Sequence, residues 1–190
     1  MSLLSYSELL ELIEQGVIDA PIENVNASSI DLTLSNILLI EPRGYDFDED
    51  DGHQIDLYKK ESIFTHVWDM DDKYDGGPYP LSPGEFILAS TREVFSLPNN
   101  ISAEYKLKSS MARNGLEHLN AGWCDAGWHG STLTLELKNM TRTHQLRLRT
   151  GMKIGQVVFF KHAPVPDHAS YATKGQYNGQ STTTPSKGIR

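Results

Sequence analysis

The chain has 190 residues and a mass of 21.3 kDa, with 38% hydrophobic and 22% charged residues. This length and balance predict a single domain over residues 1–190 and exclude a coiled coil, a collagen-like chain and wholesale disorder. The formal charge of −8 gives no general positive field for nucleic acid, and no stretch has the roughly 20 apolar residues of a membrane helix, so we expect neither as a partner.

The N-terminal segment predicts a short helix over residues 4–16. Ser5 and Glu8 have the spacing of a capping box, and Gly16 is suited to end the helix in the left-handed conformation. The segment lacks the basic start, apolar middle and small-residue cleavage site of a signal peptide. Cys124 is the one cysteine, which excludes an internal disulfide and a Cys-rich zinc site, so the sequence predicts a cytoplasmic protein.

The alternation of apolar and polar residues predicts the first strands. In residues 29–34, Ile30 and Leu32 fall on one face and Asp31 and Thr33 on the other, as in a half-buried strand, and residues 37–40 continue the sheet. Residues 46–75 then hold eleven acidic residues and three lysines, which predicts a long solvated loop with short strands around 63–67.

A succession of short β runs follows residue 84. Turn signals separate them at nearly regular intervals, which predicts an all-β sandwich or barrel behind the short N-terminal helix. Residues 170–190, rich in Gly, Gln, Ser and Thr, predict a mobile tail. The predicted strands span residues 86–90, 92–95, 103–107, 132–138, 145–149 and 154–160.

One segment places two cations and two hydroxyls within six residues. These are Lys108, Ser109, Ser110 and Arg113. Arginine binds phosphate through a planar fork and lysine as a compact charge, so the cluster suits a triphosphate. A short helix or turn with exposed cations fits the same composition, and the segment does not match a Walker loop.

A carboxylate lies on a predicted rigid strand. Period-2 geometry directs Leu133, Leu135 and Leu137 into the core and leaves Thr134 and Glu136 on the opposite face. Taken alone, a glutamate on the polar side of a strand is usually a solvated surface group.

Six blocks together resemble the dCTP deaminase branch of the dUTPase superfamily. The resemblance implies a dUTPase-like, jelly-roll-like distorted β-barrel that forms a homotrimer with active sites at subunit boundaries. It also implies hydrolytic deamination of dCTP to dUTP and ammonia, with Mg²⁺ carried by the triphosphate and no zinc. Independently, zinc deaminases need His and Cys ligands in spacings that a single cysteine does not supply. The blocks are residues 27–32, 83–91, 108–113, 121–128, 133–137 and 151–156.

The resemblance assigns roles by position. Glu136 resembles the general base that activates water for attack at C4 of cytosine, and Ser109 and Arg113 resemble the residues that orient the reactants. Residues 170–190 resemble a tail that closes over the nucleotide. The implied substrate contacts are Lys108 and Ser110 for the triphosphate, Asp125 for the deoxyribose 3′-hydroxyl, Thr134 and Leu135 for the base, and Gln156, Tyr171, Gln176 and Gln180 for the nucleotide.

The chain departs from the family pattern in the loop before the predicted strand that carries Glu136. Residues 115–122 are one residue shorter than usual and residues 130–136 one longer, so we expect a compensating β-bulge near Ser131. For His118 and His129, which lie in this loop, a nucleotide contact and ordinary packing both stay open.

Two single positions also differ. Gln176 replaces the usual lysine, so one phosphate contact is weaker or comes from Lys174. Asn120 lies near a threonine linked in relatives to inhibition by dTTP, which leaves dTTP as a possible inhibitor.

Two other functions remain open. Asp125 suits water activation at the α-phosphate, as in a dUTPase or in a bifunctional enzyme that carries dCTP to dUMP and pyrophosphate. The second function is that of a nucleotide-binding regulator that has lost catalytic turnover. The rearranged loop before Glu136 motivates this alternative.

Overall fold

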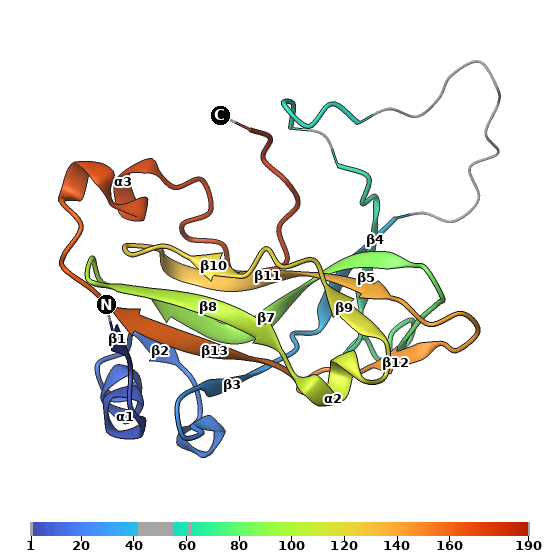
Figure 1. The fold of residues 1–190 in the computed structure, drawn as a ribbon. Helices are drawn as coiled ribbons and strands as arrows, with labels where there is room; N and C mark the ends of the chain where they lie inside the picture. The colour runs from blue at the N-terminus through green and yellow to red at the C-terminus, as the bar shows by residue number, and fades with distance from the viewer. Residues whose placement is uncertain (1, 42–54, 61, 190) are drawn as a thin grey trace.

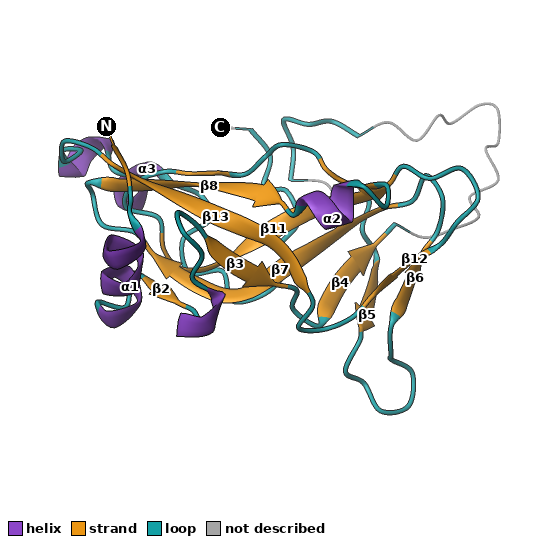
Figure 2. Ribbon diagram, turned by 60° about the horizontal axis from the view of Figure 1, so that its bottom comes forward, coloured by secondary structure: helices purple, strands orange, loops and turns teal. Residues whose placement is uncertain are grey.

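A computed structural model describes residues 2–41, 55–60 and 62–189 (Figure 1). The predicted all-β class is confirmed, since strands in two larger sheets and one two-stranded sheet dominate the chain (Figure 2). Part of the acidic segment 46–75 lies outside the described residues. The helices are α1 (Tyr6–Glu14), α2 (Ser109–Ala112) and α3 (Tyr171–Lys174), with 3₁₀ turns at Ile22–Asn24 and Asp167–Ala169.

The first sheet has the strand order β1-β13-β8-β10, and β3 also pairs with β13. Its pairings are antiparallel throughout. The strands are β1 (Ser2–Leu3), β3 (Ile30–Thr33), β8 (Ile101–Leu107), β10 (Trp123–Cys124) and β13 (Lys153–Lys161).

The second sheet has the order β5-β4-β7-β11-β9, and β2 also pairs with β7. The predicted strands 86–90 and 92–95 form one continuous strand, β7. The strands are β2 (Ile18–Asp19), β4 (Ile37–Ile40), β5 (His66–Asp69), β7 (Phe86–Ser96), β9 (Leu116–His118) and β11 (His129–Asn139), and the two-stranded sheet pairs β6 (Tyr79–Leu81) with β12 (Leu146–Leu148).

The predicted capping box and glycine stop of helix α1 are confirmed, and the helix itself spans Tyr6–Glu14 within the predicted range 4–16. The Ser5 main-chain N–H donates to the Glu8 carboxylate at 2.9 Å, and Gly16 follows the helix with a φ of 69°. Because glycine adopts this left-handed conformation without a Cβ clash, the chain turns directly into β2.

The expected half-buried strand is buried on both faces. Ile30 and Leu32 of β3 are fully buried, but Asp31 on the other face is only 4% exposed. The exposed-face prediction for Asp31 is therefore wrong, because the side chains of Lys108 and Lys153 reach its carboxylate at 2.7 and 3.2 Å, the latter from the paired strand β13.

The predicted β-bulge is confirmed in the pairing of β11 with β7. His129 pairs with Ser96 and Ser131 with Phe95, so Gly130 is the extra residue, with a φ of 58°. A second register shift follows before Thr134. The bulge restores the alternation that buries the side chains of Leu135 and Leu137.

The C-terminal tail lies along β11 and reaches β4 (Figure 1). The Gln180 amide Nε2 donates to the Thr132 carbonyl at 2.8 Å, and the Thr183 hydroxyl donates to the Ile37 carbonyl at 2.7 Å. Its mobility and its closure over a ligand stay predictions.

Candidate active site

A cavity of about 470 Å³ lies between β11, residues 121–128 and the tail. Tryptophan and tyrosine side chains form much of its wall, and Phe64 and Phe86 close one end edge to face, with ring centroids 5.4 Å apart. Five residues selected from the sequence line this one cavity: Asp125, Thr134, Glu136, Tyr171 and Gln180.

Glu136 enters the cavity from β11, between the core residues Leu135 and Leu137. Its side chain is 24% exposed, and its Oε2 lies 3.3 Å from Nε2 of His118. His118 is buried in β9, which pairs with β11, so the imidazole approaches the carboxylate from the protein interior. The sequence left the role of His118 open; the structure places it against Glu136.

Tyr105 completes this buried group. Its ring centroid lies 4.5 Å from that of His118, and burial, together with the negative charge of Glu136, raises the pKa of the Tyr105 hydroxyl. Among the described residues, Tyr105 Oη, His118 Nε2 and Glu136 Oε2 are buried atoms without a well-formed hydrogen bond, and the last two have only their 3.3 Å contact with each other. Buried polar atoms normally have partners, so this group is suited to hold a small polar species.

Thr134 lies between two main-chain contacts that one side of β11 makes with other segments. The Thr132 N–H donates to the Gln180 carbonyl at 2.9 Å, and the Glu136 carbonyl accepts from the Leu119 N–H at 3.3 Å. Because alternate residues of a strand direct their N–H and C=O groups to the same side, Thr134 presents its own pair between these contacts. Leu135 faces the other way, toward Ala89 of β7, and its side chain lies in the core.

Asp125 also lines the cavity, together with two tryptophans. The exposed Trp123 donates its indole N–H to the Asp125 carboxylate at 2.9 Å and stacks on Phe160, with centroids 6.0 Å apart. The buried Trp128 donates to the Tyr177 carbonyl at 2.9 Å, which links the hairpin to the tail.

The tail supplies further wall residues, but Gln176 is not among them. Its carbonyl accepts from the Lys187 ammonium at 2.6 Å, and its Nε2 donates to Gly188 at 3.5 Å, so it contacts the end of the tail. Lys174 lines a neighbouring cavity of about 320 Å³ together with Asp125 and Tyr171. Burial raises the pKa of Tyr171.

The residues predicted to bind the phosphates and to orient the reactants lie outside the cavity that holds Glu136. Ser109 and Ser110 lie in α2, and Arg113 lines a separate cavity of about 700 Å³. In the described part of the chain, neither these residues nor Lys108 and Gln156 line the cavity that holds Glu136. Figures 1 and 2 place α2 and α3 at different ends of the sheets.

No group of three or more His, Cys, Asp or Glu side chains is arranged to hold a metal ion in residues 2–41, 55–60 and 62–189. Over the same residues, none of the helices is long and apolar enough to cross a bilayer.

The fold and the cavity together define an all-β protein with a carboxylate at the edge of an aromatic pocket. A crystal structure of 2′-deoxycytidine 5′-triphosphate deaminase from Agrobacterium tumefaciens shares this fold, with a TM-score of 0.59 and 22% identity over 83% of this chain and 48% of that chain. The chain thus spans about half of that protein. The expected dUTPase-like architecture is confirmed, with open, distorted sheets in place of a closed barrel.

Sequence comparison identifies the family. Residues 3–162 match the profile described as dCTP deaminase-like. A Methanosphaerula palustris protein named "dCTP deaminase, dUMP-forming" is 40% identical over 134 residues, 70% of this chain and 69% of that protein. Proteins of the same name from Rhodococcus opacus and Mycobacterium tuberculosis are 35% and 36% identical over 166 residues, 86% of this chain and 82% of each. The chain belongs to the dCTP deaminase-like family.

Proposed function

We propose that the protein deaminates dCTP hydrolytically. The observation that carries the proposal is Glu136, held against buried His118 in the cavity that Asp125 and Thr134 also line. A carboxylate, a polar main-chain edge and aromatic walls suit a flat base bearing a leaving amine.

The reaction follows from these positions. Glu136 takes a proton from water as the oxygen bonds to C4 of cytosine, and protons then pass to N3 and to the amine, which leaves as ammonia while the C4 carbonyl forms. A well-placed proton shuttle of this kind contributes on the order of 10²–10⁴ in rate. In this proposal Thr134 contacts the base edge, and Asp125 accepts a hydrogen bond from the deoxyribose 3′-hydroxyl.

In this proposal, the groups that bind the phosphates and orient the reactants come from a second subunit. Ser109, Ser110 and Arg113 lie outside the Glu136 cavity of their own chain, so a homotrimer in which α2 of one subunit reaches the cavity of the next would join the two halves. Mg²⁺ would arrive on the triphosphate and neutralise part of its charge. Inhibition by dTTP stays a prediction. Asn120 adopts a φ of 60° directly before Ala121 of the cavity wall.

We further propose dUMP as the final product. The similar proteins from three organisms all carry the name "dUMP-forming". Asp125 lies in the same cavity as Glu136, which gives a second carboxylate for water attack at the α-phosphate, with release of pyrophosphate.

One incubation with dCTP and Mg²⁺ tests both steps. We expect ammonia, dUMP and pyrophosphate, and we expect Glu136→Gln to abolish ammonia release while dCTP still binds. Ammonia with dUTP as the end product would contradict the second step alone. Tight dCTP binding without any product would show a regulator and overturn the proposal.

A further inference from the structure

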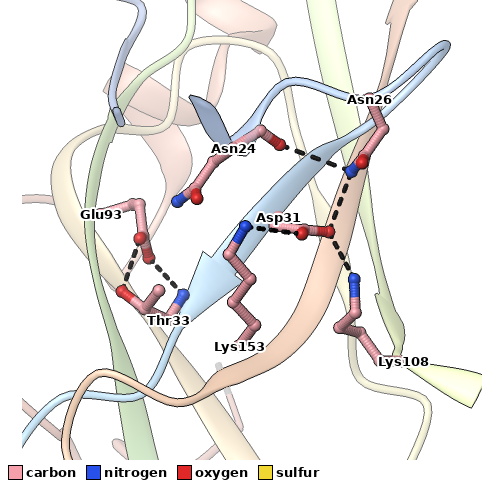
Figure 3. A network of polar contacts seen from close by, with 7 residues as sticks. All are labelled: Asn24, Asn26, Asp31, Thr33, Glu93, Lys108 and Lys153. Atoms are coloured by element: carbon pink, nitrogen blue, oxygen red, sulfur yellow. Dashed lines mark hydrogen bonds and ion pairs between the residues drawn. The ribbon is translucent and has the colours of Figure 1, made fainter. Parts of the chain in front are cut away.

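Asp31 connects three elements from a buried position (Figure 3). Its Oδ1 accepts from the Lys108 ammonium at 2.7 Å and from the Asn26 amide at 2.9 Å, and its Oδ2 lies 3.2 Å from the Lys153 ammonium. Lys108 precedes α2, Lys153 begins β13, and Asp31 lies in β3, which pairs with β13. One carboxylate thus joins two cations from distant parts of the sequence.

The carboxylate is covered while the ammonium groups remain accessible. The Asp31 side chain is 6% exposed, against 28% for Lys108 and 45% for Lys153. Burial favours the neutral acid, but the hydrogen bonds from Lys108, Asn26 and Lys153 outweigh it and keep the pKa of Asp31 below its usual value. The group therefore carries one negative and two positive charges, with the positive charges outward.

Both ammonium groups keep donors for a ligand. An ammonium has three N–H donors, and the contact with Asp31 uses one on each lysine. Gln156 pairs with Asp31 in the β3–β13 register, and directly paired residues of neighbouring strands share a face of the sheet. Two residues with implied nucleotide contacts, Lys108 and Gln156, therefore flank the same buried carboxylate.

We infer that Asp31 is a positioning residue that fixes Lys108 and Lys153 as a preformed cation pair for a polyphosphate, and that Lys153 is a second phosphate contact. The inference rests on the proposed function, because it identifies the pair with the phosphate end of the nucleotide. Two lysines held by one anchor lose little side-chain freedom when the ligand binds, which favours affinity.

The direction in which one substitution changes anion affinity distinguishes a positioning role of Asp31 from a purely electrostatic one. Asp31→Asn removes a negative charge, so through-space electrostatics alone would make an anion bind more tightly. Positioning predicts the reverse: without the carboxylate the two ammonium groups are released, and affinity for inorganic tripolyphosphate falls at least about tenfold. In turnover, KM for dCTP rises by a similar factor while kcat changes little.

Lys153→Gln provides the second test, because this side chain is 45% exposed and Asp31 keeps its bonds to Lys108 and Asn26 in the variant. We expect a loss of several-fold in tripolyphosphate affinity, measured by calorimetry on the full chain, and a weaker dependence on salt. Lys161→Gln is the matched control, with the same charge change at the far end of the same strand, β13, and unchanged affinity is expected.

The outcomes are decisive either way. Equal or tighter binding by a folded Asp31→Asn protein overturns the positioning role, and equal binding by the Lys153 and Lys161 variants overturns the phosphate contact. If Asp31→Asn does not fold, the Lys153 comparison decides alone, since a shared anchor without a phosphate role would leave affinity unchanged. Tripolyphosphate binding needs no turnover, so wild-type protein that binds it but releases no ammonia from dCTP would refute the proposed function and leave this inference standing.

Discussion

His118 contacts Glu136 from the buried side of β11, at 3.3 Å. Replacing it by glutamine shortens the reach of the polar group and leaves Glu136 free to rotate, so we expect kcat for ammonia release to fall about tenfold to a hundredfold with little change in KM. Steady-state kinetics with dCTP measure both constants.

His129→Gln is the control for this prediction, because His129 is exposed and its Nδ1 lies 2.9 Å from the Gly127 carbonyl, away from Glu136. Equal effects of the two substitutions would contradict a specific role for His118.

Glu93 is a second buried carboxylate, outside the cavity. Burial raises its pKa, and the hydrogen bonds donated by the Thr33 N–H at 2.9 Å and the Thr33 hydroxyl at 2.7 Å offset only part of this effect. The folded state therefore holds the proton to a higher pH than the unfolded chain. The contribution of Glu93 to the free energy of unfolding must fall as the pH rises from about 4.3 through the raised pKa.

Glu93→Gln removes this titration. Denaturant unfolding from pH 4 upward should give a stability difference, wild type minus variant, that declines across that window and is constant above it. A difference that increases with pH would show that the hydrogen bonds from Thr33 dominate over burial.

The sequence identifies some residues of the site and not others, for a physical reason. Glu136 and Asp125 occur in blocks whose order and spacing are local properties of the chain. Asp31 was predicted on an exposed face because its partner Lys108 lies 77 residues away, and alternation within one strand carries no information on such a contact. His118 was ambiguous for the same reason.

At the scale of elements, the number of residues in a loop was a better guide to the structure than the positions where strands were expected to break. The one-residue surplus before Glu136 predicted a bulge near Ser131, and the register confirms one at the neighbouring Gly130. Thr91 was expected to separate two strands, yet β7 continues through it. Its hydroxyl donates to the Glu93 carbonyl at 3.0 Å and accepts from the Leu133 N–H at 3.0 Å, so a buried side chain replaces the lost ladder bond.

The tail is the element whose removal should separate binding from folding. Deleting residues 176–190 removes Tyr177, Gln180, Thr184, Pro185 and Ser186 from the cavity wall, while the strands of both sheets remain. We expect KM for dCTP to rise at least about tenfold with little loss of β structure by circular dichroism. An unchanged KM would exclude the tail from the nucleotide site.

Thr183 offers a milder version of that experiment. Its buried hydroxyl donates to the Ile37 carbonyl and contacts Ser90. Thr183→Val loses both contacts at similar volume, whereas Thr183→Ser keeps the hydroxyl, so only the valine variant should raise KM.

At the scale of the whole molecule, the two halves of the proposed site lie on different parts of one chain. Glu136 lines one cavity and Arg113 another. If each site takes Glu136 from one subunit and Arg113 from the next, Glu136→Gln and Arg113→Ala proteins are inactive alone but regain about a quarter of the activity when co-expressed in equal amounts, since random cyclic assembly restores one site in four.

Complementation fails if both residues act within one chain, because every site then contains one substitution. Sedimentation of the wild-type protein gives the subunit number independently of activity. Absence of recovery together with a monomeric mass would refute the shared site.

The class of the fold was predictable, but its strand order was not. Alternation and regularly spaced turns indicated strands, whereas pairs such as β3 with β13 and β2 with β7 join segments far apart in sequence. Which strands meet depends on complementary buried faces across the whole chain, and local patterns do not contain that information.

Trp123 is 53% exposed, and its indole N–H is bonded to Asp125, the residue proposed to take the sugar hydroxyl. A nucleotide that hydrogen-bonds to the Asp125 carboxylate must displace the Trp123 indole and change its surroundings. The fluorescence of Trp123 should therefore report nucleotide binding. Trp68 does not line this cavity and supplies a steadier background of emission, whereas Trp128 is buried in the cavity wall and contributes a second, smaller response. Fluorescence titration would then follow ligand binding without any label, and the Trp123→Phe protein would show a clearly smaller change in emission.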